Sequence, residues 1–304
     1  MSTVLISGAS GFIGSHLVDS LSANGHRVAR LARKRSRRPD ASNTIIWDPG
    51  AGRIDRESLA RLQPDAVINL AGEPIAQRWT PDRRMRIRES RVRGTTALAE
   101  ALTTLPAKPS VFLSGSAIGY YGAHRADDLL DEQSAAGTDF LAETARDWER
   151  ATDAASSAGI RVVLLRTGIV LGKDGGVLER LLPPFRLGLG GPLGAGRQWM
   201  SWIALADIVA AMQFLIVTTT VSGPVNLVAP EPSRNKEFAK TLARVLGRPA
   251  FLPVPTFALQ AIFGTMADNT ILASQRVTPK RLAGAGFEFR HPRLEEALRF
   301  ELNR

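Results

Sequence analysis

Short apolar runs alternate with amphipathic stretches along the first half of the chain. Strands are predicted at 3–7, 27–32, 43–47, 66–70, 110–114 and 161–166, and helices at 12–23, 55–61, 81–104 and 139–158. This alternation is typical of a parallel sheet with helices on both faces. The chain is therefore predicted to have an α/β fold, with a doubly wound Rossmann sheet whose ligands bind beyond the carboxyl ends of the strands.

The pattern changes after about residue 170, where glycine and proline become dense. Further elements are predicted as a helix at 205–216, a strand at 224–228, a helix opened by Pro253 and Pro255, and a terminal helix at 295–300. We expect a Rossmann domain over 1–229, in which 170–200 contributes a loop to the cleft. A smaller helical or mixed substrate lobe is expected over 230–304.

Composition narrows the class of protein. The 304 residues are 44% hydrophobic and 22% charged, which is ordinary for a globular chain with a large core. The absence of cysteine excludes disulfides and thiolate metal sites, and no metal is expected. Because no signal segment or membrane-length apolar run is evident, a soluble cytoplasmic monomer or homodimer without a membrane partner is expected.

The formal net charge of +10 suggests an anionic partner. The densest basic run, residues 33–38, could bind nucleic acid, but no aromatic residues interleave it for base stacking. No nucleic-acid partner is expected, because the start of this run has another use at a cofactor phosphate.

The turn after the first strand carries the strongest chemical signal. Gly8, Gly11 and Gly14 form a GxxGxxG pattern between a predicted strand and a predicted helix. Such glycines allow a tight turn, a close approach of backbone to pyrophosphate, and close packing of helix on strand. The phosphates would lie at the helix N-terminus, which favours anions. The residues predicted to contact a dinucleotide here are Gly8, Ser10, Gly11, Phe12, Ile13 and Gly14.

The end of the second strand indicates which dinucleotide binds. A free ribose 2′-hydroxyl usually meets an acidic residue at this point. Here Ala32 is followed by Arg33, Lys34 and Arg35, and no acid is present. Since arginine suits a 2′-phosphate, NADP(H) is predicted over NAD, with Arg33 as the main contact. Leu70, Ala71 and Gly72, after the strand at 66–70, should allow the backbone to pass near the ribose and pyrophosphate.

A second glycine-rich turn, Ser114–Gly122, follows another apolar strand. With it, the chain resembles an atypical extended short-chain dehydrogenase/reductase. More narrowly, it resembles the NAD(P)-dependent nucleotide-sugar epimerase family that has a C-terminal domain of unknown function and a cell-division-inhibitor-like description. The matching segments are GASGFIG, Trp47-Asp48-Pro49, NLAGEPI, Ser90-Arg91, SAIGYYG, LRTGIVLG at 165–172, LPPFRLGLGGPLGAGRQWMSWI, and Gln275-Arg276-Val277 with Pro279.

This resemblance implies a Rossmann lobe that binds NADP and a smaller lobe that closes over substrate. By position it implicates Ala32, Arg33, Leu70, Ala71, Arg91 and Arg166 in cofactor contact. Arg91 and Arg166 could equally be structural residues in ion pairs. The family's substrate is poorly defined, so the resemblance does not specify a reaction.

The chain departs from the wider superfamily at the catalytic pair. Those enzymes use Tyr-x-x-x-Lys, in which the lysine lowers the pKa of the tyrosine. Neither tyrosine of this chain, Tyr120 or Tyr121, is followed by lysine four residues later, and Phe140 and Thr144 occupy the usual positions. Ser116 matches the superfamily serine that binds the reacting oxygen. Its catalytic partners are predicted to be Tyr120 or Tyr121 as a displaced acid, although both could pack in the core.

Two further sets complete the candidates. Glu143 and Glu149 lie on the helix beside the predicted cleft, where a solvated helix face is the expected position. Arg197, Gln198 and Trp199 follow a glycine-rich loop, and they could hold an anionic planar substrate or pack as a structural loop.

Two functions remain open from sequence. The first is an NADP-dependent oxidoreductase or epimerase acting on a small polar substrate, such as a nucleotide sugar. The second is a catalytically degenerate NADP-binding protein that senses redox state or regulates a partner. The absent Tyr/Lys pair favours the second, and the SAIGYYG turn and long glycine loop favour the first.

Overall fold

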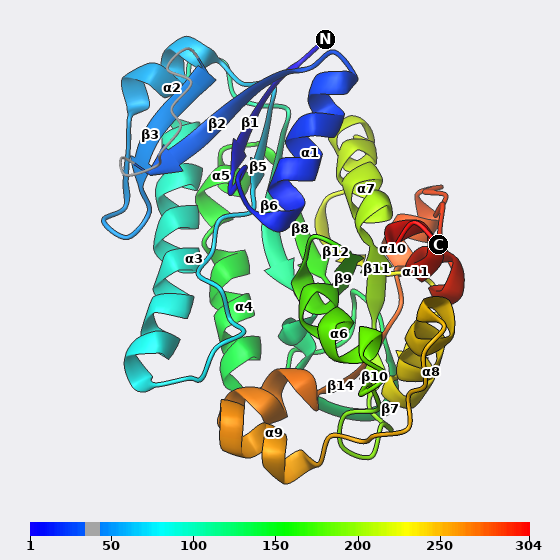
Figure 1. Cartoon of the computed structure of the whole chain (residues 1–304). Coiled ribbons are helices and arrows are strands. Elements are labelled where there is room, and N and C mark those ends of the chain that lie inside the picture. The colour runs from blue at the N-terminus through cyan, green and yellow to red at the C-terminus, as the bar shows by residue number, and fades with distance from the viewer. Residues whose placement is uncertain (34–42) are drawn as a thin grey trace.

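The computed structural model describes residues 1–33 and 43–304, and its centre is an eight-stranded sheet (Figure 1). The strands follow the order β12-β8-β6-β5-β1-β2-β3-β4, and all neighbours are parallel except β3 and β4. Their bounds are β1 Thr3–Ser7, β2 Arg27–Arg33, β3 Thr44–Asp48, β4 Arg53–Ile54, β5 Ala66–Asn69, β6 Val111–Ala117, β8 Arg161–Thr167 and β12 Gly223–Leu227. The predicted doubly wound fold is confirmed.

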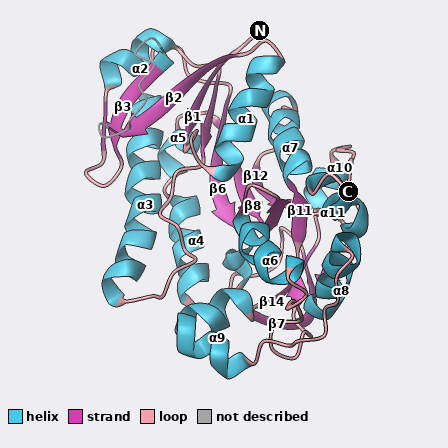
Figure 2. Cartoon of the chain, in the orientation of Figure 1, coloured by secondary structure: helices cyan, strands magenta, loops and turns pink. Residues whose placement is uncertain are grey.

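Helices cover both faces of this sheet (Figure 2). One apolar cluster joins a sheet face to α1 and α7, and a second joins the other face to α2, α3 and α5. The helices are α1 Phe12–Ala23, α2 Arg56–Leu62, α3 Pro81–Thr103, α4 Phe140–Arg150, α5 Asp153–Ser157 and α7 Leu205–Val217. The single helix expected at 139–158 is two helices, because the Thr152 hydroxyl donates to the carbonyl of Glu149 at 2.7 Å where α4 ends.

The remaining elements form a second body of structure beside the sheet. They are the 3₁₀ turn η2 Ile118–Tyr121, β7 His124–Leu130, β9 Ile169–Gly172, α6 Gly176–Arg186, β10 Trp199–Met200, β11 Trp202–Ala204, β13 Ser233–Arg234, α8 Asn235–Leu246, α9 Thr256–Phe263, the π turn η3 Ala267–Ile271, β14 Ser274–Val277, α10 Lys280–Gly284 and α11 Leu294–Glu301. β9 pairs with β11, β10 with β13, and β14 with β7.

One core joins the two sides of the predicted boundary at 229/230. Leu178 and Phe185 of α6, Trp202 of β11 and Phe238 of α8 pack in the same apolar cluster. The boundary itself stays a prediction, but residues 169–204 pack with the C-terminal helices rather than forming only a cleft loop.

Candidate functional site

The loop between β1 and α1 is fixed by contacts that leave no room for side chains. Gly8 has φ +69°, and a Cβ there would lie 2.8 Å from the carbonyl carbon of Leu70. A Cβ on Gly14 would lie 2.1 Å from the Gly8 carbonyl oxygen. These two glycines therefore let the loop approach β5 and let α1 pack onto the loop.

The start of α1 carries the features of an anion site. Gly11 is its N-cap without a side-chain hydrogen bond, and no acidic residue lies in the first turn. The first N–H groups of a helix lack intrahelical acceptors and favour negative charge. Ser10 and Gly11 are exposed, whereas Phe12 and Ile13 are half-buried. The predicted phosphate contacts thus lie together at this helix end.

A buried polar chain fixes the neighbouring loop after β5. Ser7 Oγ donates to Asn69 Oδ1 at 2.5 Å and accepts from the Ala71 N–H at 3.2 Å. Asn69 Nδ2 and Trp148 Nε1 both donate to Thr95 Oγ1, at 2.8 and 2.9 Å. This chain holds the backbone of Leu70 and Ala71 beside Gly8.

Arg91 supports the same loop from α3. Its Nη1 donates to the carbonyls of Glu73 and Ile87, both at 3.0 Å, and its guanidinium lies 5.1 Å from the centre of the Trp148 ring. A Cβ on Gly72 would lie 3.1 Å from this guanidinium. Burial lowers the pKa of Arg91 to about 10. The predicted cofactor contact stays a prediction beside this loop-holding role.

Arg33 is exposed at the carboxyl end of β2, next to Ala32. This is the edge at which β1 leads into the glycine loop, since β1 and β2 are parallel neighbours. Lys34 and Arg35 lie outside the described residues.

The predicted serine belongs to a buried charged cluster at the ends of β6 and β8. Ser116 Oγ donates to Glu149 Oε1 at 2.7 Å. Arg166, the β8 neighbour of Ser116, donates from Nε to Glu149 Oε1 at 2.9 Å and from Nη2 to Oε2 at 3.0 Å. The Arg166 side chain is 3% exposed and that of Glu149 is 10% exposed.

This cluster changes two expectations. Glu149 is not on a solvated helix face, because α4 places its carboxylate against Arg166; Glu143 is exposed, as expected. Arg166 uses its donors inside the protein, and this geometry does not favour the predicted direct contact with cofactor. Burial lowers the pKa of Arg166, but Glu149 and Tyr121 together raise it by more, so it lies above its usual value.

The two tyrosines have different surroundings. Tyr121 is fully buried; its hydroxyl donates to Asn226 Oδ1 at 2.7 Å and accepts from Arg166 Nη1 at 3.1 Å. Burial raises the pKa of Tyr121 to about 12, which does not favour its predicted role as an acid. Tyr120 is half-buried, and its ring centre lies 3.4 Å from Arg166 Cζ. Of the two, Tyr120 is the better catalytic candidate.

The three residues predicted to hold substrate, Arg197, Gln198 and Trp199, differ in their surroundings. Gln198 is buried, and its Nε2 donates to the carbonyls of Leu193 and Ile271, which favours a structural role. Trp199 is half-buried, and the guanidiniums of Arg234 and Arg276 lie 4.1 and 4.7 Å from its ring centre. Arg197 is exposed. Substrate contact by these three residues stays a prediction.

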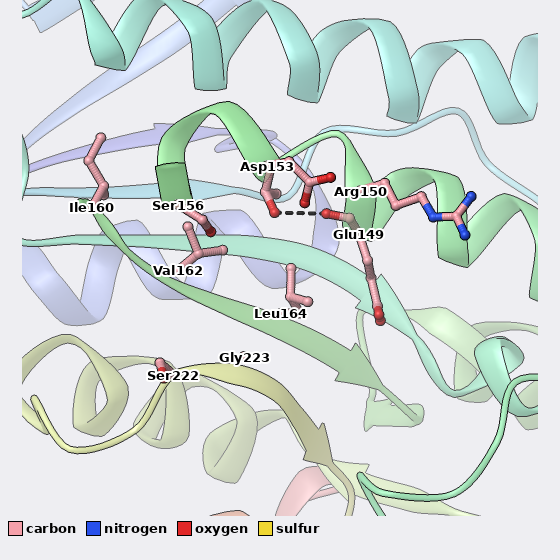
Figure 3. A pocket seen from close by; sticks show the side chains of 10 residues that line it. Glu149, Arg150, Asp153, Ser156, Ile160, Val162, Leu164, Ser222 and Gly223 are labelled. Atoms are coloured by element: carbon pink, nitrogen blue, oxygen red, sulfur yellow. Dashed lines mark hydrogen bonds between the residues drawn. The ribbon is translucent and has the colours of Figure 1, made fainter. Parts of the chain in front are cut away.

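A pocket of about 420 Å³ lies beside the charged cluster (Figure 3). It is lined by Glu149, Arg150, Thr152, Asp153, Ser156, Ile160, Val162, Leu164, Ser222 and Gly223. In Figure 3 the Glu149 side chain extends toward the carboxyl ends of β6 and β8, whereas the Arg150 side chain points away. None of the residues predicted to contact cofactor lines this pocket.

Comparison with known proteins decides the family. A model of the NAD dependent epimerase/dehydratase family matches residues 4–227, and a domain of unknown function matches residues 254–301. The chain belongs to the NAD dependent epimerase/dehydratase family.

Relatives within this family match along nearly their whole length. The epimerase family protein Mb2239 of Mycobacterium bovis is 44% identical over 302 residues, covering 99% of this chain and 98% of the relative. Human epimerase family protein SDR39U1 is 35% identical over 302 residues, covering 97% and 98%. The crystal structure of human SDR39U1 isoform 2 with NADPH has a TM-score of 0.88, with 34% identity and 99% coverage of both chains.

In this epimerase/dehydratase family member, Phe140 and Thr144 of α4 occupy the positions of the superfamily's Tyr/Lys pair. The ring of Phe140 packs edge-on against that of Trp79, with 5.1 Å between the two ring centres. The Arg84 guanidinium lies 5.3 Å from the centre of the Phe140 ring. Thr144 is buried, and its hydroxyl has no hydrogen-bond partner among the described residues. Phe140 has no hydroxyl to exchange a proton, and Thr144 has no positive charge with which to lower the pKa of a tyrosine.

Two residues important to the site were missed from sequence. The Glu149 carboxylate is paired with Arg166 rather than solvated, and an arginine at the end of a buried strand is the sequence signal for a nearby carboxylate. Gln275, noted only as part of a family segment, donates from Nε2 to the carbonyls of Ile118 and Gly122, at 2.9 and 2.8 Å. It thereby ties β14 to the turn that carries both tyrosines.

Within residues 1–33 and 43–304, no cluster of three or more His, Asp or Glu residues could hold a metal ion. Among the described helices, none combines the length and apolar composition that crossing a bilayer requires.

Proposed function

We propose that this chain binds NADP(H) and acts as an oxidoreductase or epimerase. Its substrate would be a small polar molecule that carries a hydroxyl or keto group, such as a nucleotide sugar. The observation that carries the proposal is the cradle formed by Gly8, Gly11 and Gly14, with Arg33 at the adjacent strand end. A side chain at Gly8 would clash with the backbone of Leu70, and one at Gly14 with the backbone of Gly8, so only glycine allows this loop shape. The NADPH in the human relative's structure supports the choice of cofactor.

The residues present fit this cofactor. The first turn of α1 would hold the pyrophosphate, Leu70 and Ala71 would border the ribose, and Arg33 would bind the 2′-phosphate. When bound, the nicotinamide supplies or accepts hydride. Ser116 would then bind the reacting oxygen of the substrate, and Tyr120 would pack beside it. A cytoplasmic location and a monomeric or homodimeric state stay predictions.

The absent Tyr/Lys pair supports a second candidate, an NADP-binding regulatory or redox-sensing protein without efficient catalysis. The two functions share cofactor binding and differ in turnover. NADPH oxidation with a panel of keto-sugars separates them, and Ser116→Ala or Tyr120→Phe should abolish turnover while leaving NADPH affinity nearly unchanged.

Fluorescence titration with NADPH and NADH tests cofactor binding first. Arg33→Ala should weaken NADPH binding about 10- to 100-fold and leave NADH unaffected, since hydrogen bonds to charged groups contribute roughly 1.5–3 kcal/mol. Arg30→Ala is the matched control, because Arg30 is an exposed arginine on the same strand, away from the predicted phosphate. Equal affinity for both dinucleotides in the wild-type protein would contradict the role of Arg33.

A further inference from the structure

The Ser116 hydroxyl acts as a hydrogen-bond donor to Glu149, and this fixes the direction of its other hydrogen bonds. Glu149 is a carboxylate, which can only accept, so the 2.7 Å bond uses the single hydrogen of Ser116. The lone pairs of Ser116 Oγ accept no hydrogen bond among the described residues. Ser116 is therefore set to accept a hydrogen bond from a substrate hydroxyl rather than to donate one to a carbonyl.

The groups around Glu149 hold its carboxylate in place. Arg166 binds both carboxylate oxygens, and the ring of Tyr120 stacks on the guanidinium. Tyr121 and Glu132 face Arg166 from the other side, through the Tyr121 hydroxyl and the Glu132 carbonyl. Among the residues that line the pocket with Glu149, Arg150 and Asp153 are also charged.

We propose that Ser116 and Glu149 form a proton relay that takes the place of the absent Tyr/Lys pair, with Glu149 as the terminal base. This proposal rests on the proposed function and names the proton-transfer group for a hydroxyl-bearing substrate. Ser116 is the catalytic residue that touches substrate, and Glu149 acts through it.

The transfer balances over two bonds. The substrate O–H bond breaks as a new O–H bond forms on Ser116 Oγ, and the original Ser116 O–H bond breaks as one forms on Glu149 Oε1. The electron pair stays on the substrate oxygen, and Glu149 becomes neutral. In the reverse direction protonated Glu149 returns the proton through Ser116, so the same pair serves a keto substrate.

The pocket gives this proton a route to solvent. Glu149 lines it, and four other lining residues, Arg150, Asp153, Ser156 and Ser222, are exposed. Its volume of about 420 Å³ exceeds that of a water molecule many-fold. Glu149 thus accepts a hydrogen bond from Ser116 and also lines a pocket bordered by exposed residues (Figure 3).

The central variant is Glu149→Gln, because the amide oxygen still accepts from Ser116 and Arg166 but cannot take up the proton. In the NADPH-loaded protein, keto-sugar turnover should fall by roughly 100-fold or more, the size of a general acid–base contribution. NADPH affinity should stay within about twofold of wild type. Glu143→Gln, on the exposed side of the same helix, is the matched control and should retain full turnover.

Chemical rescue separates proton transfer from charge pairing. In Glu149→Ala, formate entering by the pocket should restore turnover. Nitrate, a planar anion of similar size that is essentially non-basic, should not. Restoration by nitrate as well as formate would reduce Glu149 to a counter-ion of Arg166 and overturn the relay.

A second measurement needs neither cofactor nor turnover, and so remains informative if Glu149→Ala fails to fold. Infrared titration of carbon-13 Glu-labelled protein, with Glu149→Gln identifying the band, gives the titration midpoint of Glu149. Ser116→Ala should raise it, because a hydrogen bond to the charged form is lost. An unchanged midpoint would mean that the two residues are not coupled and would contradict the relay.

NADPH affinity distinguishes a failure of the proposed function from a failure of the proton relay. Absent NADPH binding overturns the proposed function while the infrared midpoint still tests the Ser116–Glu149 link. Normal NADPH binding with full turnover by Glu149→Gln overturns the relay alone. A wild-type protein that binds NADPH but turns over no keto-sugar counts against the relay and in favour of the regulatory function.

Discussion

Arg166 and Glu149 form a two-pronged ion pair in the interior, with one nitrogen–oxygen distance of 2.9 Å and the other of 3.0 Å. Removing both charges from water is costly, and geometry of this quality with further hydrogen bonds is needed to offset that cost. Here Ser116 and Tyr121 supply the further bonds. The pair therefore joins β6, β8, α4 and η2 at the predicted reaction centre.

Breaking this pair should destabilise the protein more than deleting it. Arg166→Met leaves Glu149 buried without its cation and should lower the free energy of unfolding by about 3–5 kcal/mol. The double variant Arg166→Met/Glu149→Gln removes both charges and should lose less than the sum of the single variants. Urea denaturation followed by tryptophan fluorescence measures each value.

An exposed ion pair provides the control for that cycle. Arg244 and Glu295 approach to 2.7 Å, but their side chains are 62% and 35% exposed. Arg244→Met should change the free energy of unfolding by only about 0–1 kcal/mol. If Arg166→Met were equally mild, the interior pair would not be essential to the fold of the site.

Tyr121 should make stability fall at alkaline pH. Its pKa of about 12, against the ordinary 10.0, means that the folded state holds this proton more tightly than the unfolded chain. The corresponding contribution, roughly 3 kcal/mol, is fully present below pH 10 and is lost as pH rises through 12. Tyr121→Phe should therefore differ most from wild type at pH 8 and progressively less between pH 10 and 12.

The titration can also be read directly, because the chain has only two tyrosines. In Tyr120→Phe, tyrosinate absorbance reports Tyr121 alone. A midpoint near 10 would show that burial does not perturb this hydroxyl and would leave its predicted role as an acid open.

Elements of the fold could be predicted from the sequence where their signal lies within one short segment. The helix at 12–23 and the strand at 3–7 follow from periodicity within one segment, and the structure has the same bounds. α6 was missed because Pro183 and Pro184 disfavour a helix. Burial of Leu178, Leu182 and Phe185 against α8 overrides that local preference.

The same distinction applies to the site. Short motifs within one segment single out the glycine loop and Ser116 as candidates, and the role of Ser116 stays a prediction. The setting of Glu149 depends on α4 packing over the end of β8, which no spacing along the chain reports. β9 is absent from the predicted strands, because its partner β11 is distant in sequence, with Ile169 paired to Trp202.

Gly14 should tolerate no side chain. In Gly14→Ala the Cβ would lie 2.1 Å from the Gly8 carbonyl oxygen, so α1 must move away from the loop. We expect a loss of about 1–3 kcal/mol or more in the free energy of unfolding and at least a tenfold loss of NADPH affinity. Gly284→Ala is the control: its Cβ meets nothing within 4 Å, and stability should be unchanged or slightly higher. Equal behaviour of the two variants would contradict the described loop geometry.

Phe12 couples the cofactor loop to the turn between β9 and α6. A Cβ on Gly175 would lie 2.4 Å from Phe12 Cδ2, whereas its φ of 177° is one that alanine adopts readily. Gly175→Ala should therefore act by displacing the Phe12 ring, which shifts the first turn of α1 and weakens NADPH binding about tenfold. Phe12→Ala in the same protein makes room for the new methyl group and should recover most of that loss. The exposed neighbour Asp174→Ala should have no effect, and failure of the Phe12→Ala rescue would show that Gly175 acts by another route.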